Sequence, residues 1–231
     1  MVSCHSYLAT SHLPAMDNMG KIVVLFSVLG IALLSGISIV VEPPTVPLGE
    51  LMRYEGTMVR TRGTLTDLSR TTTGNVLLKL AANHTELVVF LQPPGTTETL
   101  LNLSYGDELE VDGQVQLYRG AYELISTQTA IRRVEQGPYP LRFVAQVATQ
   151  PERYEGEKLR ITGSIDDLYS TLFYIRDESG TYRLRVKLLT AEPALAGLQE
   201  GDRVIAEGRF AYDAPNMRYE LQLLRLELLP P

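Results

Sequence analysis

The sequence predicts an all-β protein in which two tandem, five-stranded Greek-key barrels follow one apolar N-terminal helix. Three observations lead to this prediction. One stretch occurs twice, with matched residues that differ in number by 100; apolar side chains alternate with polar ones after each copy; and one uncharged apolar run lies near the N-terminus. A chain of 231 residues is long enough for one large or two small domains, and the repeat favours two.

The repeat covers residues 53–68 and 153–168, and each copy begins with Arg-Tyr-Glu-Gly. A second glycine follows in each copy, Gly63 or Gly163. Identical residues at fixed spacing indicate a duplicated structural unit. We expect Tyr-Glu-Gly to form the turn before the first strand of each unit, and the second glycine to permit a bend in that strand.

Residues 22–41 contain no charged side chain, and their number is close to the roughly 20 residues that cross a bilayer as a helix. The sequence therefore predicts a single-pass membrane anchor over residues 21–41. Lys21 precedes the run and Glu42 follows it, so the N-terminus is expected in the cytoplasm and the barrels outside. A cleaved signal peptide is the alternative, although the run is longer than a usual signal core and no small-x-small site follows it. Residues 1–20 are expected to be disordered, and the proline-rich residues 42–47 to form a semi-rigid linker.

The first unit is predicted over residues 48–135 and the second over 141–231, with a glycine- and proline-containing boundary at 136–140. In the first strand Val59 and Thr61 alternate with Arg60 and Arg62, which is typical of a sheet with one buried face. The other predicted strands of the first unit are Leu77–Leu80, Leu87–Leu91, 109–115 and Tyr122–Ser126, with a short helix over Glu98–Leu103. Those of the second unit are Leu159–Leu168, Leu172–Arg176, Tyr182–Leu188, 204–210 and Tyr219–Leu228, with short helices over Phe143–Thr149 and Ala191–Leu198.

Two motifs occur in both units. The first motif is Tyr-Glu-Gly followed by alternating residues that lead to Arg-x-x-Gly. The second motif is Gly-Asp-x-(apolar)-x-(apolar)-x-Gly, which begins at Gly106 and at Gly201. These motifs, and the short helix between the third and fourth strands, resemble OB domains of the anticodon-binding-like type. The resemblance covers residues 48–229 as two copies and implies two OB-fold barrels; it implies no particular function. Two unrelated small barrels, or one elongated sandwich, are the competing interpretations.

Composition argues against an enzyme. The barrels contain no cysteine and one histidine, His84, which excludes a cysteine nucleophile and a zinc site of His and Cys ligands. A Gly-rich phosphate loop, G-x-S-x-G and H-E-x-x-H are all missing from the sequence. The carboxylate pairs Asp166-Asp167 and Asp177-Glu178 are better explained by strand alternation and a hairpin turn than by catalysis. We therefore predict no catalytic residue, no metal and no cofactor.

The candidate ligand-binding residues lie on the second and third strands of the second unit: Phe173, Tyr174, Tyr182, Arg183 and Arg185. OB-folds bind extended ligands across these strands, with aromatic rings that stack on bases and cations that follow phosphates. Alternation places Tyr182 opposite to both arginines, so the expected groove contains Arg183, Arg185 and one of Phe173 or Tyr174. An ordinary barrel wall with solvated arginines is the alternative.

Two further features concern charge and symmetry. Outward cations of the first strands, Arg60, Arg62, Lys158 and Arg160, would contact a polyanion or lipid headgroups, or would discourage sheet pairing. The corresponding second and third strands of the first unit are poor in aromatic residues, so two equivalent nucleic-acid sites are not expected. With 21 basic and 27 acidic residues the net charge of −6 disfavours nonspecific nucleic-acid binding, but permits a local basic groove.

The leading hypothesis is a non-enzymatic, membrane-anchored binding or scaffold protein. It would display two barrels outside the cytoplasm to a partner protein, a polysaccharide or another extended ligand. The alternative is single-stranded nucleic-acid binding through the second barrel. A third hypothesis is a haem chaperone, because haem-carrying proteins of cytochrome maturation are also anchored OB-like barrels. Their pattern needs a histidine followed four residues later by tyrosine, and here His84 is followed at that spacing by Val88.

Overall fold

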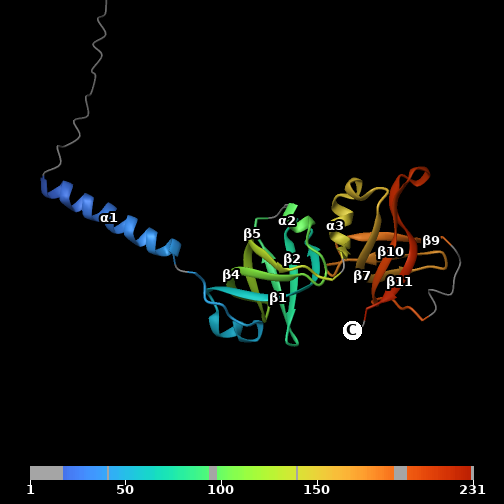
Figure 1. Ribbon diagram of the computed structural model, residues 1–231, viewed down its shortest axis with the longest axis horizontal. Helices are drawn as coiled ribbons and strands as arrows, with labels where there is room; N and C mark the ends of the chain where they lie inside the picture. The colour runs from blue at the N-terminus through green and yellow to red at the C-terminus, as the bar shows by residue number, and fades with distance from the viewer. Residues whose placement is uncertain (1–17, 41, 94–97, 139, 190–196, 230–231) are drawn as a thin grey trace, which may run out of the picture. The chain divides into compact units, whose positions relative to one another are not determined.

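The computed structural model describes residues 18–40, 42–93, 98–138, 140–189 and 197–229, with the backbone alone at residues 18, 33–40 and 99. It divides into two units, residues 1–42 and 43–231. Both barrels belong to the second unit (Figure 1).

Helix α1 (Asn18–Val40) makes up the described part of the first unit. Its described side chains run from Met19 to Ala32, and apolar ones such as Leu25 and Phe26 are exposed. Among the residues that the structure describes, no helix combines the length and the apolar character that crossing a membrane requires. The transmembrane helix predicted over residues 21–41 is therefore not supported by the described part of the chain.

The first barrel begins with the short helix η1 (Leu48–Tyr54), and α2 (Glu98–Leu101) lies between its third and fourth strands. Its strands are β1 (Met58–Arg70), β2 (Val76–Ala82), β3 (Thr85–Leu91), β4 (Glu108–Tyr118) and β5 (Ala121–Glu135). They close in the order β1-β2-β3-β5-β4. All neighbours are antiparallel except β3 and β5, and β1 pairs with β4 to complete the barrel (Figure 1). This is the strand order of an OB-fold.

The second barrel repeats the arrangement after three short elements, β6 (Arg142–Phe143), α3 (Val144–Thr149) and η2 (Pro151–Tyr154). Its strands are β7 (Lys158–Leu168), β8 (Leu172–Arg176), β9 (Arg183–Leu188), β10 (Arg203–Asp213) and β11 (Arg218–Leu228), with η4 (Ala214–Asn216) before the last. The order β7-β8-β9-β11-β10 closes through β10 and β7, and β6 adds a parallel strand to β7. The predicted all-β fold of two five-stranded OB-type barrels is confirmed. The helix predicted over Ala191–Leu198 falls mainly on residues 190–196, outside the described residues.

The repeated Tyr-Glu-Gly stretch forms the same turn in both barrels. Gly56 and Gly156 have φ angles of +79° and +81°, a left-handed conformation that favours glycine. The amide of Gly56 donates to the Val115 carbonyl at 2.8 Å, and that of Gly156 donates to the Phe210 carbonyl at 2.8 Å. The repeat therefore starts the first strand of each barrel and ties it to the fourth strand, as expected.

Strand register extends the correspondence to every strand. Val115 pairs with Leu124 and Leu124 with Val89; Phe210 pairs with Leu221 and Leu221 with Val186. Residues related in this way are termed equivalent. Equivalent residues differ in number by 100 on the first strands, by 95 on the second and fourth strands, and by 97 on the third strands. On the fifth strands the difference is 97 up to Ser126 and Leu223, and 95 beyond the bulge, where Ile131 corresponds to Leu226.

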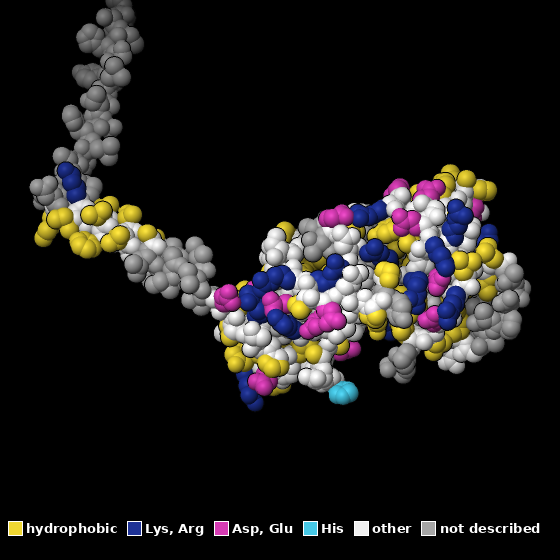
Figure 2. Space-filling view, viewed as in Figure 1, with side chains coloured by type: hydrophobic (Ala, Val, Ile, Leu, Met, Phe, Trp, Pro, Cys, Tyr) yellow, Lys and Arg dark blue, Asp and Glu magenta, His cyan; other side chains and the backbone are white. Residues whose placement is uncertain are grey.

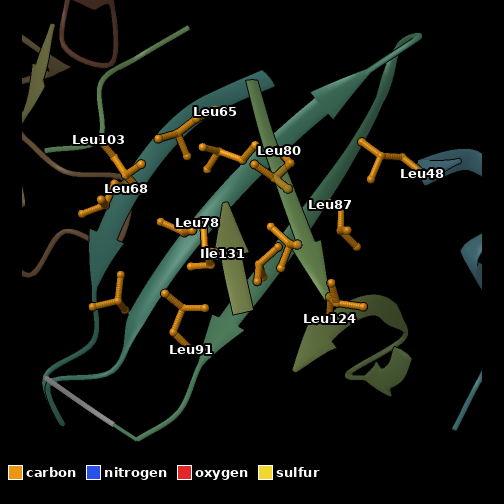
Figure 3. Close-up of a cluster of buried hydrophobic side chains, with 14 of the residues drawn as sticks. Leu48, Leu65, Leu68, Leu78, Leu80, Leu87, Leu91, Leu103, Leu124 and Ile131 are labelled. Carbon is orange, nitrogen blue, oxygen red and sulfur yellow. The ribbon is translucent and has the colours of Figure 1, made fainter. Parts of the chain in front are cut away.

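Each barrel encloses its own apolar core. Figure 3 shows the first core, in which side chains from different strands, such as Leu65 of β1, Leu78 of β2 and Leu124 of β5, are fully buried. Tyr182 packs against both cores, and Phe143 of the second barrel belongs to the first core. The two barrels therefore share packed surface.

A glycine in each fourth strand permits close approach of the fifth strand. A Cβ at Gly113 would lie 2.6 Å from Leu124 Cγ, and a Cβ at Gly208 would lie 2.3 Å from the Gln222 carbonyl oxygen. Both glycines lie at a register shift of the pairing between the fourth and fifth strands. These bulges curve the sheet so that it closes.

We expect Gly208→Ala to lower the free energy of unfolding of the second barrel by about 1–3 kcal/mol, because the new methyl group collides with backbone that cannot move without opening the barrel. Urea denaturation measures the change. Gly49→Ala is the matched control, since a Cβ there meets its nearest atom at 3.6 Å. Equal effects of the two substitutions would contradict this role of Gly208.

Candidate functional site

One outer surface of the second barrel gathers aromatic and basic side chains. Inward Phe173, Ile175, Leu184 and Val186 are buried, so alternation turns their neighbours on β8 and β9 outward. This second-barrel face consists of Tyr174, Arg176, Arg183, Arg185 and Lys187, with Glu220 from β11. The guanidinium carbon of Arg183 lies 4.4 Å from the centre of the Tyr174 ring, which is a cation–π contact.

The structure separates the five predicted ligand-binding residues into two groups. Tyr174, Arg183 and Arg185 lie on the second-barrel face. Strand alternation alone allowed either Phe173 or Tyr174 on this face. Phe173 is fully buried in the barrel core, so the aromatic residue of the face is Tyr174. Tyr182 precedes β9, donates its amide to Asp177 at 2.9 Å and packs between the two cores. The ligand-binding role of the face remains a prediction.

Carboxylates hold the cations of this face in place. Arg183 Nε lies 2.9 Å from Asp166, and Arg183 also donates to Asp167, which raises the pKa of the arginine. The buried Glu220 lies 3.2 Å from Arg185 and 3.5 Å from Lys187. Four cations thus meet three carboxylates, in a chain whose overall charge is negative. Arg176, Arg183 and Lys187 are the more exposed cations, and Arg185 is largely covered.

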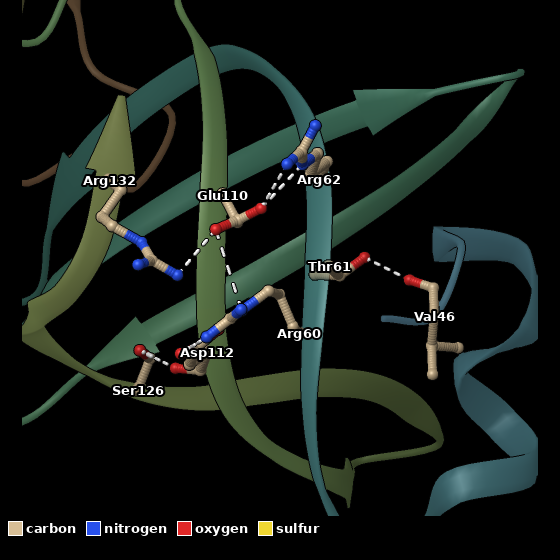
Figure 4. Close-up of polar contacts among 8 residues, drawn as sticks. All are labelled: Val46, Arg60, Thr61, Arg62, Glu110, Asp112, Ser126 and Arg132. Carbon is tan, nitrogen blue, oxygen red and sulfur yellow. Dashed lines mark hydrogen bonds and ion pairs between the residues drawn. The ribbon is translucent and has the colours of Figure 1, made fainter. Parts of the chain in front are cut away.

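The outward cations of β1 pair with acidic residues of β4 (Figure 4). Arg60 donates to both carboxylate oxygens of Asp112 at 2.7 and 2.9 Å, and Arg62 donates to Glu110 at 2.7 Å. Arg132 of β5 donates to the other oxygen of Glu110 at 2.7 Å. Hydrogen bonds from Arg62 and Arg60 hold the pKa values of Glu110 and Asp112, respectively, below their usual range. These cations support closure of the barrel.

The second barrel uses the same arrangement on β7 and β10. Lys158 Nζ lies 2.5 Å from Glu207, and its hydrogen bond lowers the pKa of that carboxyl group. Arg160 lies 3.7 Å from Glu207 and 3.4 Å from Glu227. Cross-strand ion pairing thus accounts for the outward cations of both first strands.

The first barrel has a groove of about 500 Å³ at the equivalent place. The first-barrel groove is lined by Thr71, Leu77, Val88, Phe90, Gln92, Gln116, Tyr118, Glu123 and Ile125. Its floor is apolar, and burial raises the pKa of Glu123. The groove was not predicted from the sequence. The available signal was that β2 and β3 are apolar on both faces, although only one face of each strand fills the core.

The barrels meet at a polar junction around Asp67, which is 6% exposed. Arg203 of β10 donates to the Thr66 carbonyl at 2.8 Å and lies 3.9 Å from the Asp67 carboxylate. Lys79 of the first barrel pairs with Glu178 of the second. Burial, reinforced by the charge of Glu178, raises the pKa of Asp67 to about 7, even though Arg203 acts in the opposite direction.

The remaining candidates for chemistry have structural roles. Buried Asp177 accepts hydrogen bonds from the Tyr182 amide and from Ser179 Oγ, at 2.9 and 2.6 Å, and so closes the β8–β9 hairpin. His84 is exposed in the β2–β3 turn and projects from the surface (Figure 2). Within the described ranges, no three His, Cys, Asp or Glu side chains are grouped as a metal site requires.

No family model matches the chain, and no curated protein matches it. Similar solved structures include asparaginyl-tRNA synthetase from Pyrococcus horikoshii, with 16% identity and a TM-score of 0.35 over 47% of this chain and 26% of that one. The Stn1–Ten1 complex of S. pombe has 12% identity and a TM-score of 0.29 over 41% of this chain and 79% of that one. An OBody bound to hen egg-white lysozyme has 16% identity and a TM-score of 0.35 over 42% and 100%. The chain thus spans about a quarter of the length of the synthetase.

Asp67 makes stability depend on pH. The folded protein holds a proton on Asp67 up to about pH 7, whereas the unfolded chain releases it near pH 3.8. The contribution of this group to stability is therefore fully present below pH 3.8 and is lost as pH rises through 7, by up to about 4 kcal/mol. We expect Asp67→Asn to be more stable than the wild type at about pH 8, and to lose most of this advantage at about pH 5. Denaturant titrations at both pH values measure the difference. Asp167→Asn, at the equivalent position, is the control, and the same pH-dependent difference there would contradict the assignment to Asp67.

Proposed function

We propose that this chain is a non-catalytic binding protein whose second barrel holds single-stranded nucleic acid across the second-barrel face. The observation that carries the proposal is the stacking of Arg183 on Tyr174, with three further cations on the same two strands. An aromatic ring on the outer face of a strand stacks on any of the bases, and each such contact contributes about 1–3 kcal/mol. Cations beside the ring pair with the phosphates.

Comparison of equivalent positions supports the proposal. The four cations of the face are Arg176, Arg183, Arg185 and Lys187, and their equivalents in the first barrel are Ala81, Glu86, Val88 and Phe90. A feature that the fold itself required would be present in both barrels. This cluster of cations is therefore a property of the second-barrel face and not of the fold.

The carboxylates of the face limit how much charge a ligand can use. A phosphate would compete with Asp166 and Asp167 for Arg183, and with Glu220 for Lys187. Arg185 is held by buried Glu220 and is expected to orient the face more than to bind phosphate. A small number of phosphate contacts predicts a shallow dependence of affinity on salt.

We expect the full-length chain to bind a labelled oligonucleotide of about ten nucleotides at low salt, and Tyr174→Ala and Arg183→Ala each to weaken binding about tenfold, through lost stacking and lost charge. Fluorescence anisotropy measures the affinity, and a salt titration gives the number of phosphates contacted.

The matched control for Arg183→Ala is Arg209→Ala, which removes an exposed arginine from β10 of the same barrel. Circular dichroism verifies that each variant is folded. The proposal fails if no binding occurs at low salt, or if loss of Arg209 is as harmful as loss of Arg183.

Placement of the barrels on the outer side of a cell membrane is a separate proposal. It is supported by the uncharged composition of residues 22–41 and by Lys21 before them. We expect protease added to intact cells to digest the barrels, because they would lie outside the permeability barrier. Immunoblotting against the C-terminal barrel measures digestion, with a cytoplasmic protein as the control for lysis. Digestion only after permeabilisation would contradict an external location.

A further inference from the structure

Glu123 and Glu220 occupy equivalent positions, because Glu123 pairs with Gln116 on β4 as Glu220 pairs with Ala211 on β10. Both carboxylates lie on the fifth strand of their barrel. Their surroundings differ in charge.

In the second barrel, the cations that neutralise Glu220 are Arg185 and Lys187 of β9. The residues equivalent to these two cations in the first barrel are Val88 and Phe90 of β3. The first barrel therefore has the same carboxylate, with apolar side chains at the positions of both cationic partners.

Glu123 consequently lies at the edge of an apolar surface. Within the described part of the chain, no Lys or Arg forms an ion pair with it, and burial raises its pKa. Covering such a carboxylate with a purely apolar ligand is costly, whereas a ligand with its own cation would restore the pairing seen in the second barrel.

We propose that the first-barrel groove binds an extended peptide segment of a partner protein, with apolar side chains on Leu77, Phe90 and Ile125 and a lysine or arginine side chain against Glu123. This interaction goes beyond the nucleic-acid binding proposed for the second barrel and does not depend on it.

Strand register sets the dimensions of the site. Leu77 pairs with Phe90 and Phe90 with Ile125, so these three side chains form one row across β2, β3 and β5. Two interstrand spacings of about 4.8 Å make the row about 10 Å long, which matches about three residues of an extended peptide. Val88 pairs with Glu123 in the adjacent row, and this places the carboxylate beside the peptide rather than beneath it.

The polar rim is suited to a peptide backbone. Gln92 and Gln116 line the groove, and their amide groups both donate and accept hydrogen bonds, as a peptide unit does. Nucleic acid fits less well because a phosphate would approach Glu123 without a compensating cation on the apolar floor. The guanidinium carbon of Arg119 lies 5.1 Å from the centre of the ring of Tyr118, which lines the groove.

A displayed library of random peptides, selected on the full-length chain, tests the proposal. The comparison protein is Val88→Arg/Phe90→Lys, which gives the first barrel the two residues that the second barrel carries at these positions. We expect peptides enriched on the wild type to contain a lysine or arginine flanked by apolar residues, and to be lost from the double variant. Enrichment without a cation, equal enrichment on both proteins, or no enrichment would overturn the proposal.

The most enriched peptide then provides a quantitative test. We expect Glu123→Gln to weaken its binding about tenfold, because the charge-assisted contact is lost. The matched control Glu135→Gln removes an exposed carboxylate from the same strand and should leave the affinity unchanged. A peptide with norleucine in place of the cation should bind Glu123→Gln at least as tightly as the wild type, because the variant has no unpaired carboxylate to cover. Equal binding of the cationic peptide to both proteins would overturn the assignment.

Competition separates this proposal from the function proposed for the second barrel. Oligonucleotide should not displace the peptide, and Glu123→Gln should leave oligonucleotide binding unchanged. Displacement of the peptide by oligonucleotide would assign the groove to nucleic acid and overturn the peptide site. Absence of oligonucleotide binding would overturn the function proposed for the second barrel and leave the peptide result standing.

Discussion

Closure of each barrel by pairing of its first and fourth strands is the constraint on which the rest of the structure depends. The duplicated Tyr-Glu-Gly turn ties the start of the first strand to the fourth, through Gly56 in one barrel and Gly156 in the other. Glycines at the bulges, Gly113 and Gly208, let the fifth strand approach closely enough to complete the ring. Arg60 with Asp112, and its counterparts, reinforce the same seam from outside. A closed ring fixes register, and a fixed register determines which side chain lies beside which.

Because register is fixed, the two barrels present the same set of positions with different chemistry. Both barrels share apolar side chains at the buried positions, the turns and the cross-strand ion pairs, all of which serve closure. The outer positions of the second and third strands do not contribute to closure, and they differ between the barrels. For example, Phe90 of the first barrel is equivalent to Lys187 of the second. Glu123 and Glu220 are glutamates at equivalent positions, but only Glu220 is paired with cations of its own barrel. Scaffold and surface have therefore changed independently.

Much of the fold was predictable from local signals. Alternation in β1 and β7, the Gly-Asp turns and the boundary prolines report backbone geometry directly, and the strands predicted from them are present. Local sequence could not decide which of Phe173 and Tyr174 faces outward, because both are aromatic and their register depends on the bulge in β7. The first-barrel groove was missed for a related reason: Leu77 and Phe90 look like core residues until the closed barrel shows that its interior is already full. The membrane helix illustrates the opposite case, in which composition alone supported a prediction that the described structure does not support.

The junction between the barrels joins the two outer faces through a single hairpin. Strands β8 and β9 carry the second-barrel face, and their connecting turn reaches the first barrel, where Ser179 Oγ lies 2.7 Å from the Arg70 carbonyl oxygen and Glu178 pairs with Lys79. Lys79 lies in the strand row of Val88 and Glu123, so this contact forms one end of the surface on which the groove lies. Asp67 lies beneath the same contact with its raised pKa. Movement of the hairpin would therefore alter both faces together. The stability of the hairpin, and with it the protonation of Asp67, thus depends on both barrels and not on either barrel alone.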